Sequence, residues 1–101
     1  MEINTSEGCL DLLHLIEENS NISQRELARK SGLSLGKVNY CIKALAEIGY
    51  IKINNFKNSD SKLNYLYLLT PSGIFNKTII TKKFLRQKQQ EYDKLKSYLS
   101  K

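Results

Sequence analysis

The sequence predicts a fold that is mainly α with a small β-hairpin (α+β), completed by a long C-terminal helix. Three observations lead to this fold class. Apolar residues recur twice at the helical spacing i, i+3, i+4, i+7 before Gly49, and they alternate with period two directly after it. Between Pro71 and Leu99, Gly73 is the one residue that disfavours a helix. The chain has 101 residues, enough for one hydrophobic core and therefore one domain.

The first helix is expected to run from a capping hydroxyl at Thr5 or Ser6 to about Glu18. Its apolar residues share one helical face because they are spaced by three, four and seven positions. They are Cys9, Leu12, Leu13 and Ile16. The polar residues 19–21 then indicate a turn.

Two further helices are expected in close succession. Ser23 and Glu26 fit a capping box, and Gly32 lies where a helix commonly ends in a left-handed turn. After this turn, Ser34 caps a third helix that ends at Gly49. The inward face of the third helix consists of Val38, Cys41, Ile42 and Leu45.

A β-hairpin is expected after Gly49. Residues 50–53 alternate with period two, and residues 63–69 form a second run of Leu and Tyr with strand character. Residues 54–62 between them are rich in Asn, Ser and Lys, so we interpret them as the loop of the hairpin and name them the wing loop.

The long C-terminal helix is expected to begin at Pro71, after the capping hydroxyl of Thr70. It spans roughly 29 residues, or about 43 Å at 1.5 Å per residue. Steps of four and three residues along it give the heptad positions of a coiled coil. These positions are Ile74, Thr78, Thr81, Leu85, Lys88, Tyr92, Leu95 and Leu99.

We interpret this seam as a dimerisation surface, since its distal apolar residues would otherwise project into water. The expected dimerisation residues are Ile74, Leu85, Tyr92, Leu95 and Leu99. The alternative is a single amphipathic helix lying on its own domain. Three polar positions in the seam weaken the coiled-coil interpretation.

The distribution of charge separates two parts of the chain. Sixteen Lys and Arg and ten Asp and Glu give a net charge of +6. Residues 1–22 hold five of the acids and no base, whereas residues 23–101 hold all sixteen bases and the other five acids. Only the second part is suited to a polyanionic partner, because a basic surface concentrates phosphates through its field. A solvated lysine-rich surface is the alternative.

Neither a membrane span nor a secretory signal is visible in the sequence. No run approaches the roughly 18 apolar residues of a span, and residues 1–6 have neither a basic start nor an apolar stretch. We therefore expect a cytoplasmic protein with no membrane partner.

Few side chains could support metal binding or catalysis. Cys9, Cys41 and His14 are the only soft or imidazole ligands, so we expect no metal and no cofactor. No pattern of nucleophile and base surrounds His14, so we expect no catalytic residue and no enzymatic activity. Both cysteines lie on apolar helix faces, and in a cytoplasmic protein we expect them to be reduced rather than joined.

The third helix carries a polar face opposite its core residues. Its lysines can contact phosphates or guanine edges, Asn39 can make the paired contact that adenine offers, and Tyr40 can reach a phosphate or a thymine methyl. Taken singly, such residues are common on solvent-exposed helices, and Tyr40 could instead pack against the hairpin. The candidate recognition residues are Ser34, Gly36, Lys37, Asn39, Tyr40 and Lys43.

Two neighbouring segments add candidate contacts to a DNA backbone. The amides and side chains at the start of the second helix can hold phosphates, as can a polar hairpin loop. The candidates in the second helix are Ser23, Gln24 and Arg25, and those in the wing are Asn55, Lys57, Asn58, Ser59 and Lys62.

These segments resemble the winged helix-turn-helix of the MarR family of bacterial regulators. The similarity is greatest to the short branch associated with exopolysaccharide (EPS) gene clusters, and it covers nearly the whole chain except residues 1–8 and the extreme C-terminus. The residues that carry it are 23–28 (SQRELA), 32–34 (GLS), 38–45 (VNYCIKAL), 49–51 (GYI), 55–58 (NFKN) and 69–73 (LTPSG).

The resemblance implies a homodimeric transcriptional regulator that binds double-stranded DNA at a pseudo-palindromic operator of exopolysaccharide genes. Residues 1–70 would form the winged helix-turn-helix, and residues 71–101 a dimerisation helix packed on the same domain. The third helix would enter the major groove, with the wing at the neighbouring minor groove or backbone. Longer relatives often bind a small anion between additional helices that this chain lacks, so an effector is not implied.

Two other functions fit the same fold. A winged helix can dock an acidic protein partner and join a coiled coil through its long helix, but its exposed face would then be richer in apolar anchors. Binding of structured RNA normally needs several exposed aromatic residues, and this sequence offers Tyr40 and Phe56. Binding to DNA is therefore the interpretation that we favour from the sequence.

Overall fold

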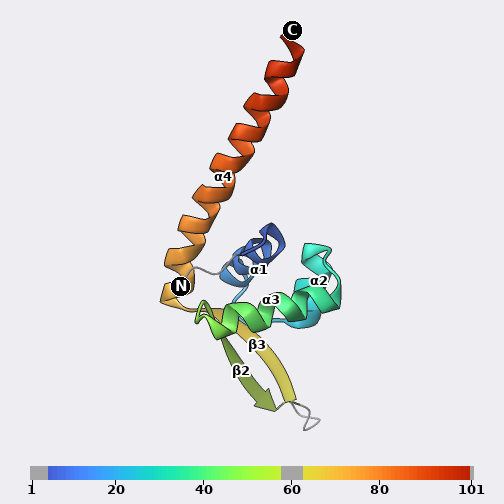
Figure 1. The fold of residues 1–101 in the computed structure, drawn as a ribbon. Coiled ribbons are helices and arrows are strands. Elements are labelled where there is room, and N and C mark those ends of the chain that lie inside the picture. Colours follow the sequence, from blue (N-terminus) through green and yellow to red (C-terminus); the bar gives the residue numbers. More distant parts are fainter. Residues whose placement is uncertain (1–4, 58–62, 101) are drawn as a thin grey trace.

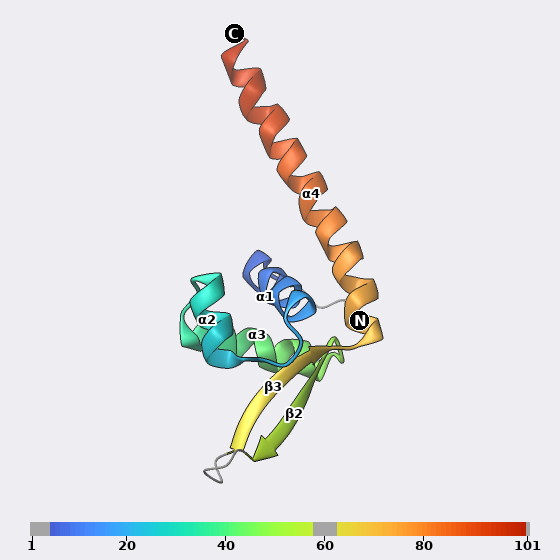
Figure 2. The same cartoon turned by 180° about the vertical axis from the view of Figure 1, so that it is seen from behind.

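The computed structural model describes residues 5–57 and 63–100 and confirms the expected fold class (Figure 1). Helices α1, α2 and α3 form a compact body, the β-hairpin projects from it, and α4 extends away on the other side (Figures 1 and 2). The elements are α1 (Glu7–Glu18), β1 (Ile22–Ser23), α2 (Gln24–Ser31), α3 (Leu35–Glu47), β2 (Ile51–Lys57), β3 (Leu63–Leu69) and α4 (Pro71–Leu99).

All four helices begin at the hydroxyl residues that the sequence indicates. The side-chain oxygens of Ser6, Ser23, Ser34 and Thr70 each accept a hydrogen bond from the backbone N–H three residues later, at 3.0–3.2 Å. These bonds satisfy amides that have no partner within the helix. The turn after α2 is also as expected, because Gly32 has a φ of 75°.

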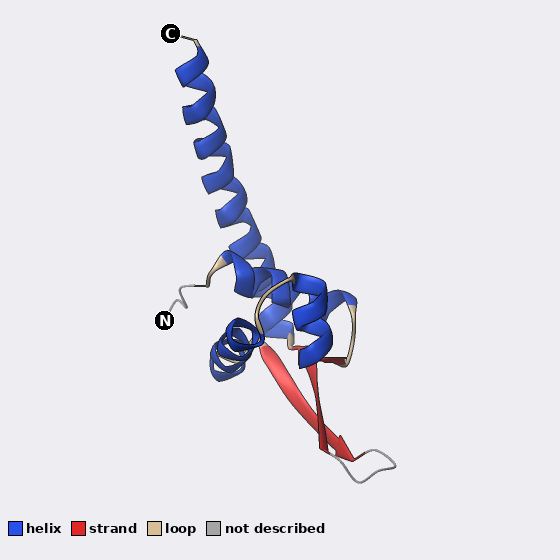
Figure 3. Cartoon of the chain, turned by 90° about the vertical axis from the view of Figure 1, so that its right-hand side faces the viewer, coloured by secondary structure: helices blue, strands red, loops and turns tan. Residues whose placement is uncertain are grey.

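The sheet is larger than the expected two-stranded hairpin. It has three antiparallel strands in the order β1-β3-β2, and the third strand arises because Ile22 and Ser23 pair with Tyr67 and Leu66 (Figure 3). A strand of two residues has no detectable alternation, so the sequence pattern could not indicate it.

The hairpin strands are also longer than expected. Residues 54–57, which we assigned to the wing loop, belong to β2, where Asn54 pairs with Leu66 and Lys57 pairs with Leu63. The assignment was wrong because it rested on polar composition. A hairpin that projects into solvent can carry polar side chains while its backbone groups stay paired.

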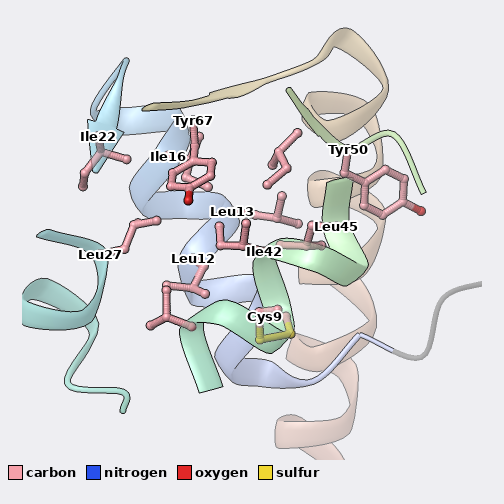
Figure 4. Close-up of a cluster of buried hydrophobic side chains, with 13 residues drawn as sticks. Cys9, Leu12, Leu13, Ile16, Ile22, Leu27, Ile42, Leu45, Tyr50 and Tyr67 are labelled. Atoms are coloured by element: carbon pink, nitrogen blue, oxygen red, sulfur yellow. A yellow bond between two sulfur atoms is a disulfide. The ribbon is translucent and has the colours of Figure 1, made fainter. Parts of the chain in front are cut away.

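The hydrophobic core lies between α1, α3 and the root of the sheet (Figure 4). The 3-4-7 residues of the first and third helices are buried in it, as expected from their spacing. Leu27 of α2, Ile22 of β1 and Tyr67 of β3 complete the core. The chain is thus folded around two facing helices, with the outer side of α3 left exposed.

The two cysteines form a disulfide, which corrects our expectation of reduced thiols. The bond joins the Sγ atoms of Cys9 in α1 and Cys41 in α3. The expectation rested on the cellular compartment, whereas the geometry follows from the packing of two apolar helix faces. This packing brings the Cα atoms to 5.3 Å, within the usual range for a disulfide.

Helix α4 is joined to the domain through a close contact between two backbones. The N–H of Thr70 donates to the carbonyl of Tyr50 at 3.0 Å, and the Thr70 hydroxyl donates to the carbonyl of Gly49 at 2.6 Å. One turn later, Gly73 is buried against the same Tyr50 carbonyl, and a Cβ at this position would lie 2.0 Å from its oxygen. Only glycine fits at position 73 of α4.

Side-chain contacts with α1 then hold the lower part of α4. Lys77 donates to Glu17 and to Nδ1 of His14, the second at 2.8 Å, and its side chain is mostly buried. Further along, Lys88 pairs with Glu7 at 3.4 Å. Helix α1 therefore runs beside α4 from about residue 77 to residue 88.

Within the described residues, no helix has both the length and the apolar content that crossing a membrane requires.

The contact at Gly73 leads to a prediction for stability. Gly73→Ala should lower the free energy of unfolding by about 2–3 kcal/mol, because the added methyl must displace the Tyr50 backbone. The control is Gly36→Ala in α3, where the nearest atom to an added Cβ is the Ser34 hydroxyl oxygen at 4.0 Å, so stability should stay unchanged or rise slightly. Urea denaturation monitored by circular dichroism measures both changes. Equal stabilities of the two variants would contradict the proposed role of Gly73.

The disulfide leads to a second prediction. It closes a loop between residues 32 positions apart, so reduction should lower the free energy of unfolding by about 2–4 kcal/mol. Denaturation with and without a dithiol reductant measures the difference, and the double variant Cys9→Ala, Cys41→Ala should not respond to the reductant. If a thiol reagent detects two free thiols in the folded chain before any reductant is added, the disulfide is contradicted.

Candidate nucleic-acid interface

The outward side of α3 carries all of the residues that the sequence assigned to recognition. Val38, Cys41, Ile42 and Leu45 are buried, so the opposite face of the helix points to solvent. At 100° per residue, Gly36, Tyr40 and Lys43 lie almost directly opposite the core, with Asn39 and Lys37 on the two flanks. Each of the six candidates is exposed, including Ser34 at the N-cap.

Tyr40 stands out from the helix rather than packing against the hairpin. Its side chain is 65% exposed, and the Lys37 ammonium lies 5.3 Å from the centre of its ring. This cation–π contact holds a positive charge beside an aromatic ring at the N-terminal end of α3. The structure therefore brings together two residues that the sequence could only place one turn apart.

Leu35 is an exposed apolar residue at the N-terminal end of α3, between the core side and the flank of Asn39, that the sequence analysis missed. It lies three residues before Val38, so the helical spacing alone would place it in the core, yet it is 59% exposed as the first residue of α3. Its position directly after the Ser34 cap was the available signal. An exposed leucine here can contact a thymine methyl group in a major groove.

The three candidates at the start of α2 differ in whether their side chains already form hydrogen bonds within the chain. The Ser23 hydroxyl caps α2 by accepting from Glu26, and the Gln24 side chain accepts from the Tyr67 hydroxyl at 3.3 Å. Arg25 is exposed. Of the three, Arg25 is the side chain best placed to reach an external phosphate.

The candidates in the wing lie at the far end of the hairpin. Asn55 and Lys57 are residues of β2, paired with Tyr65 and Leu63 of β3. Asn58, Ser59 and Lys62 lie outside the described residues. The hairpin projects from the body beside α3 and away from the free end of α4, as a wing does (Figure 1).

The acidic and basic parts of the chain have separate locations in the fold. Three acids of α1 are used within the chain: Glu7 and Glu17 bind lysines of α4, and Glu18 pairs with His14. Residues 23–48, which form α2 and α3, hold five bases and two acids. The negative N-terminal segment therefore faces α4, and the outer side of α2 and α3 keeps a net positive charge.

A concave region with a volume of about 510 Å³ lies between α1, α2 and α4. Among the side chains that line it, Lys77 already contacts Glu17 and His14. Both apolar and polar side chains line it, among them Leu10, Leu15, Asp11, Lys30, Lys77 and Thr81. No three metal-ligating side chains gather anywhere in residues 5–57 and 63–100.

Residues 10–52 match a family model described as winged helix-turn-helix DNA-binding. This region extends from α1 to the first residues of β2, so it contains α2, the turn and α3. The sequence matches none of the curated proteins with which it was compared.

Solved structures of bacterial regulators have the same fold. The chain superimposes on MarR with a TM-score of 0.72 and 21% identity, covering 88% of this chain and 64% of MarR. It superimposes on smu.1704 from Streptococcus mutans UA159 with a TM-score of 0.68 and 16% identity, covering 87% of both chains. For FabT from Streptococcus pneumoniae, solved in complex with DNA, the TM-score is 0.61 and the identity 14%, covering 89% of this chain and 62% of FabT.

The similarity extends over part of the longer regulators only. The chain spans about three fifths of the length of MarR and of PcaV from Streptomyces coelicolor. At these identities the similarity establishes the fold, and it does not extend to the residues that contact a ligand or a partner.

Proposed function

We propose that this chain is a transcriptional regulator that binds double-stranded DNA through α3 and the wing, as a homodimer on a pseudo-palindromic operator. The observation that carries the proposal is the outward face of α3. Its lysines, asparagine and tyrosine are all exposed on a helix whose other side is fixed in the core. A recognition helix in a major groove requires this division of one helix into two faces.

The electrostatics support the same proposal. Glu7 and Glu17 of α1 are paired with lysines of α4, so these two acids do not cancel the positive charge of α2 and α3. Such a basic surface draws the protein to the phosphate backbone irrespective of sequence, and the side chains of α3 then read base edges. The winged helix of FabT, which shares this fold, was solved with DNA bound.

The rival functions have less support. A protein-docking surface needs apolar anchors at its centre, whereas the exposed large aliphatic side chain of α3, Leu35, lies at the start of the helix and off the centre of its outward face. Within the described side chains, Tyr40 is the aromatic residue of this face, which is little for stacking RNA bases. The concave region between α1, α2 and α4 has its Lys77 ammonium already paired, so the proposal includes no small-molecule effector. Exopolysaccharide genes are the targets that the sequence resemblance favours.

Selection from random duplex DNA, followed by sequencing, tests base recognition. The wild type should enrich one motif, and Asn39→Ala should bind that motif more weakly by about 1–3 kcal/mol while its affinity for random duplex changes little. The control is Gln90→Ala on α4, which removes an exposed amide far from α3 and should leave both affinities unchanged. Equal losses for the selected motif and for random DNA would remove Asn39 from the reading face.

The salt dependence of binding tests the backbone contacts. Arg25→Ala, Lys57→Ala and Lys62→Ala should each weaken binding to all sequences alike, and each should reduce the slope of log affinity against log salt concentration by about 0.9. Lys94→Ala, in the distal part of α4, is the matched control and should keep the slope of the wild type. A changed base preference at an unchanged slope would contradict the assignment of these residues to phosphates.

A further inference from the structure

Lys37 and Tyr40 of α3 are in contact with each other while both remain exposed. The Lys37 ammonium lies 5.3 Å from the centre of the Tyr40 ring, and both residues are open to solvent. The attraction between the cation and the ring holds the two side chains together. Residues three positions apart on a helix differ by about 4.5 Å along its axis, so both side chains leave α3 within one turn.

The start of α1 supports Lys37 from another side. An added Cβ at Gly8 would lie 3.7 Å from Cε of Lys37, so the methylene stem of Lys37 passes over the backbone of Gly8. Lys37 and Tyr40 also line one hollow of about 120 Å³ between the start of α1 and α3. The side chain of Lys37 is thus held on two sides, so it loses less conformational entropy when its ammonium binds a ligand.

The Lys37 ammonium is available to acceptors outside the chain. Across residues 5–57 and 63–100, no carboxylate forms an ion pair with it, whereas Lys77 and Lys88 of α4 are paired with acids of α1. Gly36, directly before Lys37, lies opposite the core, and the nearest atom to an added Cβ there is the Ser34 hydroxyl oxygen at 4.0 Å. Because no side chain stands at this position, base edges can come close to the backbone of α3 beside Lys37.

The two side chains match two different groups on the edges of bases. In a major groove, the O6 and N7 atoms of guanine are the acceptors to which lysine and arginine most commonly bind, and the C5-methyl of thymine is an apolar group that a ring can cover. Stacked base pairs repeat every ~3.4 Å. Since 5.3 Å separates the ammonium from the ring centre, the two groups reach the same base pair or two neighbouring ones. Guanine and thymine belong to different base pairs, so these pairs are neighbours.

We propose that Lys37 and Tyr40 act as one reading unit for a G·C pair next to a T·A pair, with the Lys37 ammonium on guanine and the Tyr40 ring on the thymine methyl. Gly8 is a positioning residue of this unit, because it supports the stem of Lys37 without touching DNA. The inference rests on the DNA binding of the proposed function and names bases that its recognition helix reads. It assigns Lys37 to a base edge, whereas Arg25 stays assigned to the phosphate backbone.

Selections from random duplex DNA locate the two base pairs. The reference is the motif that the wild type enriches. The selection with Lys37→Met should lose the preference for guanine at one pair of this motif, because methionine keeps the stem and removes the ammonium. The selection with Tyr40→Ala should lose the preference for thymine at one pair, and the two pairs should be adjacent.

Modified duplexes then remove one DNA group at a time. Deoxyuridine in place of the thymine lacks one methyl and should weaken wild-type binding about fourfold. Tyr40→Ala should bind both duplexes equally, and Tyr40→Phe, which keeps the ring, should respond like the wild type. Replacing the T·A pair with C·G should also weaken wild-type binding, and 5-methylcytosine at that position should restore about fourfold of it, since it presents the same methyl. In place of the guanine, 7-deazaguanine lacks the N7 acceptor and should weaken the wild type about tenfold and Lys37→Met not at all.

Gly8→Leu tests the positioning role without changing either reading side chain. The new side chain occupies the space of the Lys37 stem, so the response to 7-deazaguanine should fall while the response to deoxyuridine persists. A general loss of structure would lower both responses, and circular dichroism verifies that each variant keeps its helices. The control is Gln90→Ala on α4, which extends away from α3 (Figure 1) and should bind every duplex like the wild type. The expected dimerisation residues of this helix are exposed as well: Ile74, Leu85, Tyr92, Leu95 and Leu99. Fluorescence anisotropy measures the dissociation constants.

Two results overturn the reading unit. In the first, Lys37→Met weakens the selected motif and random duplex alike and reduces the salt slope by about 0.9, which makes Lys37 a phosphate contact. In the second, the affected base pairs are not adjacent, or the modified bases weaken Tyr40→Ala and Lys37→Met as much as the wild type. Both results leave an enriched motif, and with it the proposed regulator. A wild type that enriches no motif ends the proposed function together with this inference.

Discussion

The close approach of α4 to the carbonyl of Tyr50 is the constraint on which the arrangement of this protein depends. Thr70 caps the helix, donates from its backbone to Tyr50 and from its hydroxyl to Gly49, and Gly73 leaves the space that the Tyr50 oxygen occupies. Four residues thereby determine both where α4 begins and the direction it takes. Because Tyr50 leads directly into β2, the same contact ties α4 to the base of the hairpin.

Helix α1 connects the two ends of the molecule that carry the proposed functions. On one side it is joined covalently to α3 through Cys9 and Cys41, and on the other its carboxylates bind Lys77 and Lys88 of α4. The carboxylates of α1 thus neutralise lysines of α4, and they leave the basic face of α3 unneutralised. The ion pairs between α1 and α4 and the exposed basic residues of α3 therefore lie on different sides of the domain.

Local chemistry explains what the sequence could predict. The four helix starts follow from hydroxyl caps, and the faces of α1 and α3 follow from the 3-4-7 spacing, so both the core and the exposed face of α3 were predictable. The features that escaped prediction depend on contacts between distant residues. Strand β1 exists because β3 offers it a partner, and the Cys9–Cys41 bond exists because α1 faces α3.

The length of α4 makes it a lever arm whose contacts with the domain extend from Thr70 to Lys88. The helix is 29 residues long and about 43 Å from root to tip, so each degree of rotation at its root moves the tip by about 0.75 Å. A rotation of a few degrees at Gly73 would therefore displace Leu99 by a few ångströms, and it would also shift Lys77 and Lys88 against α1. Whatever contacts the distal turns is mechanically coupled to the backbone at Tyr50, and through it to the hairpin.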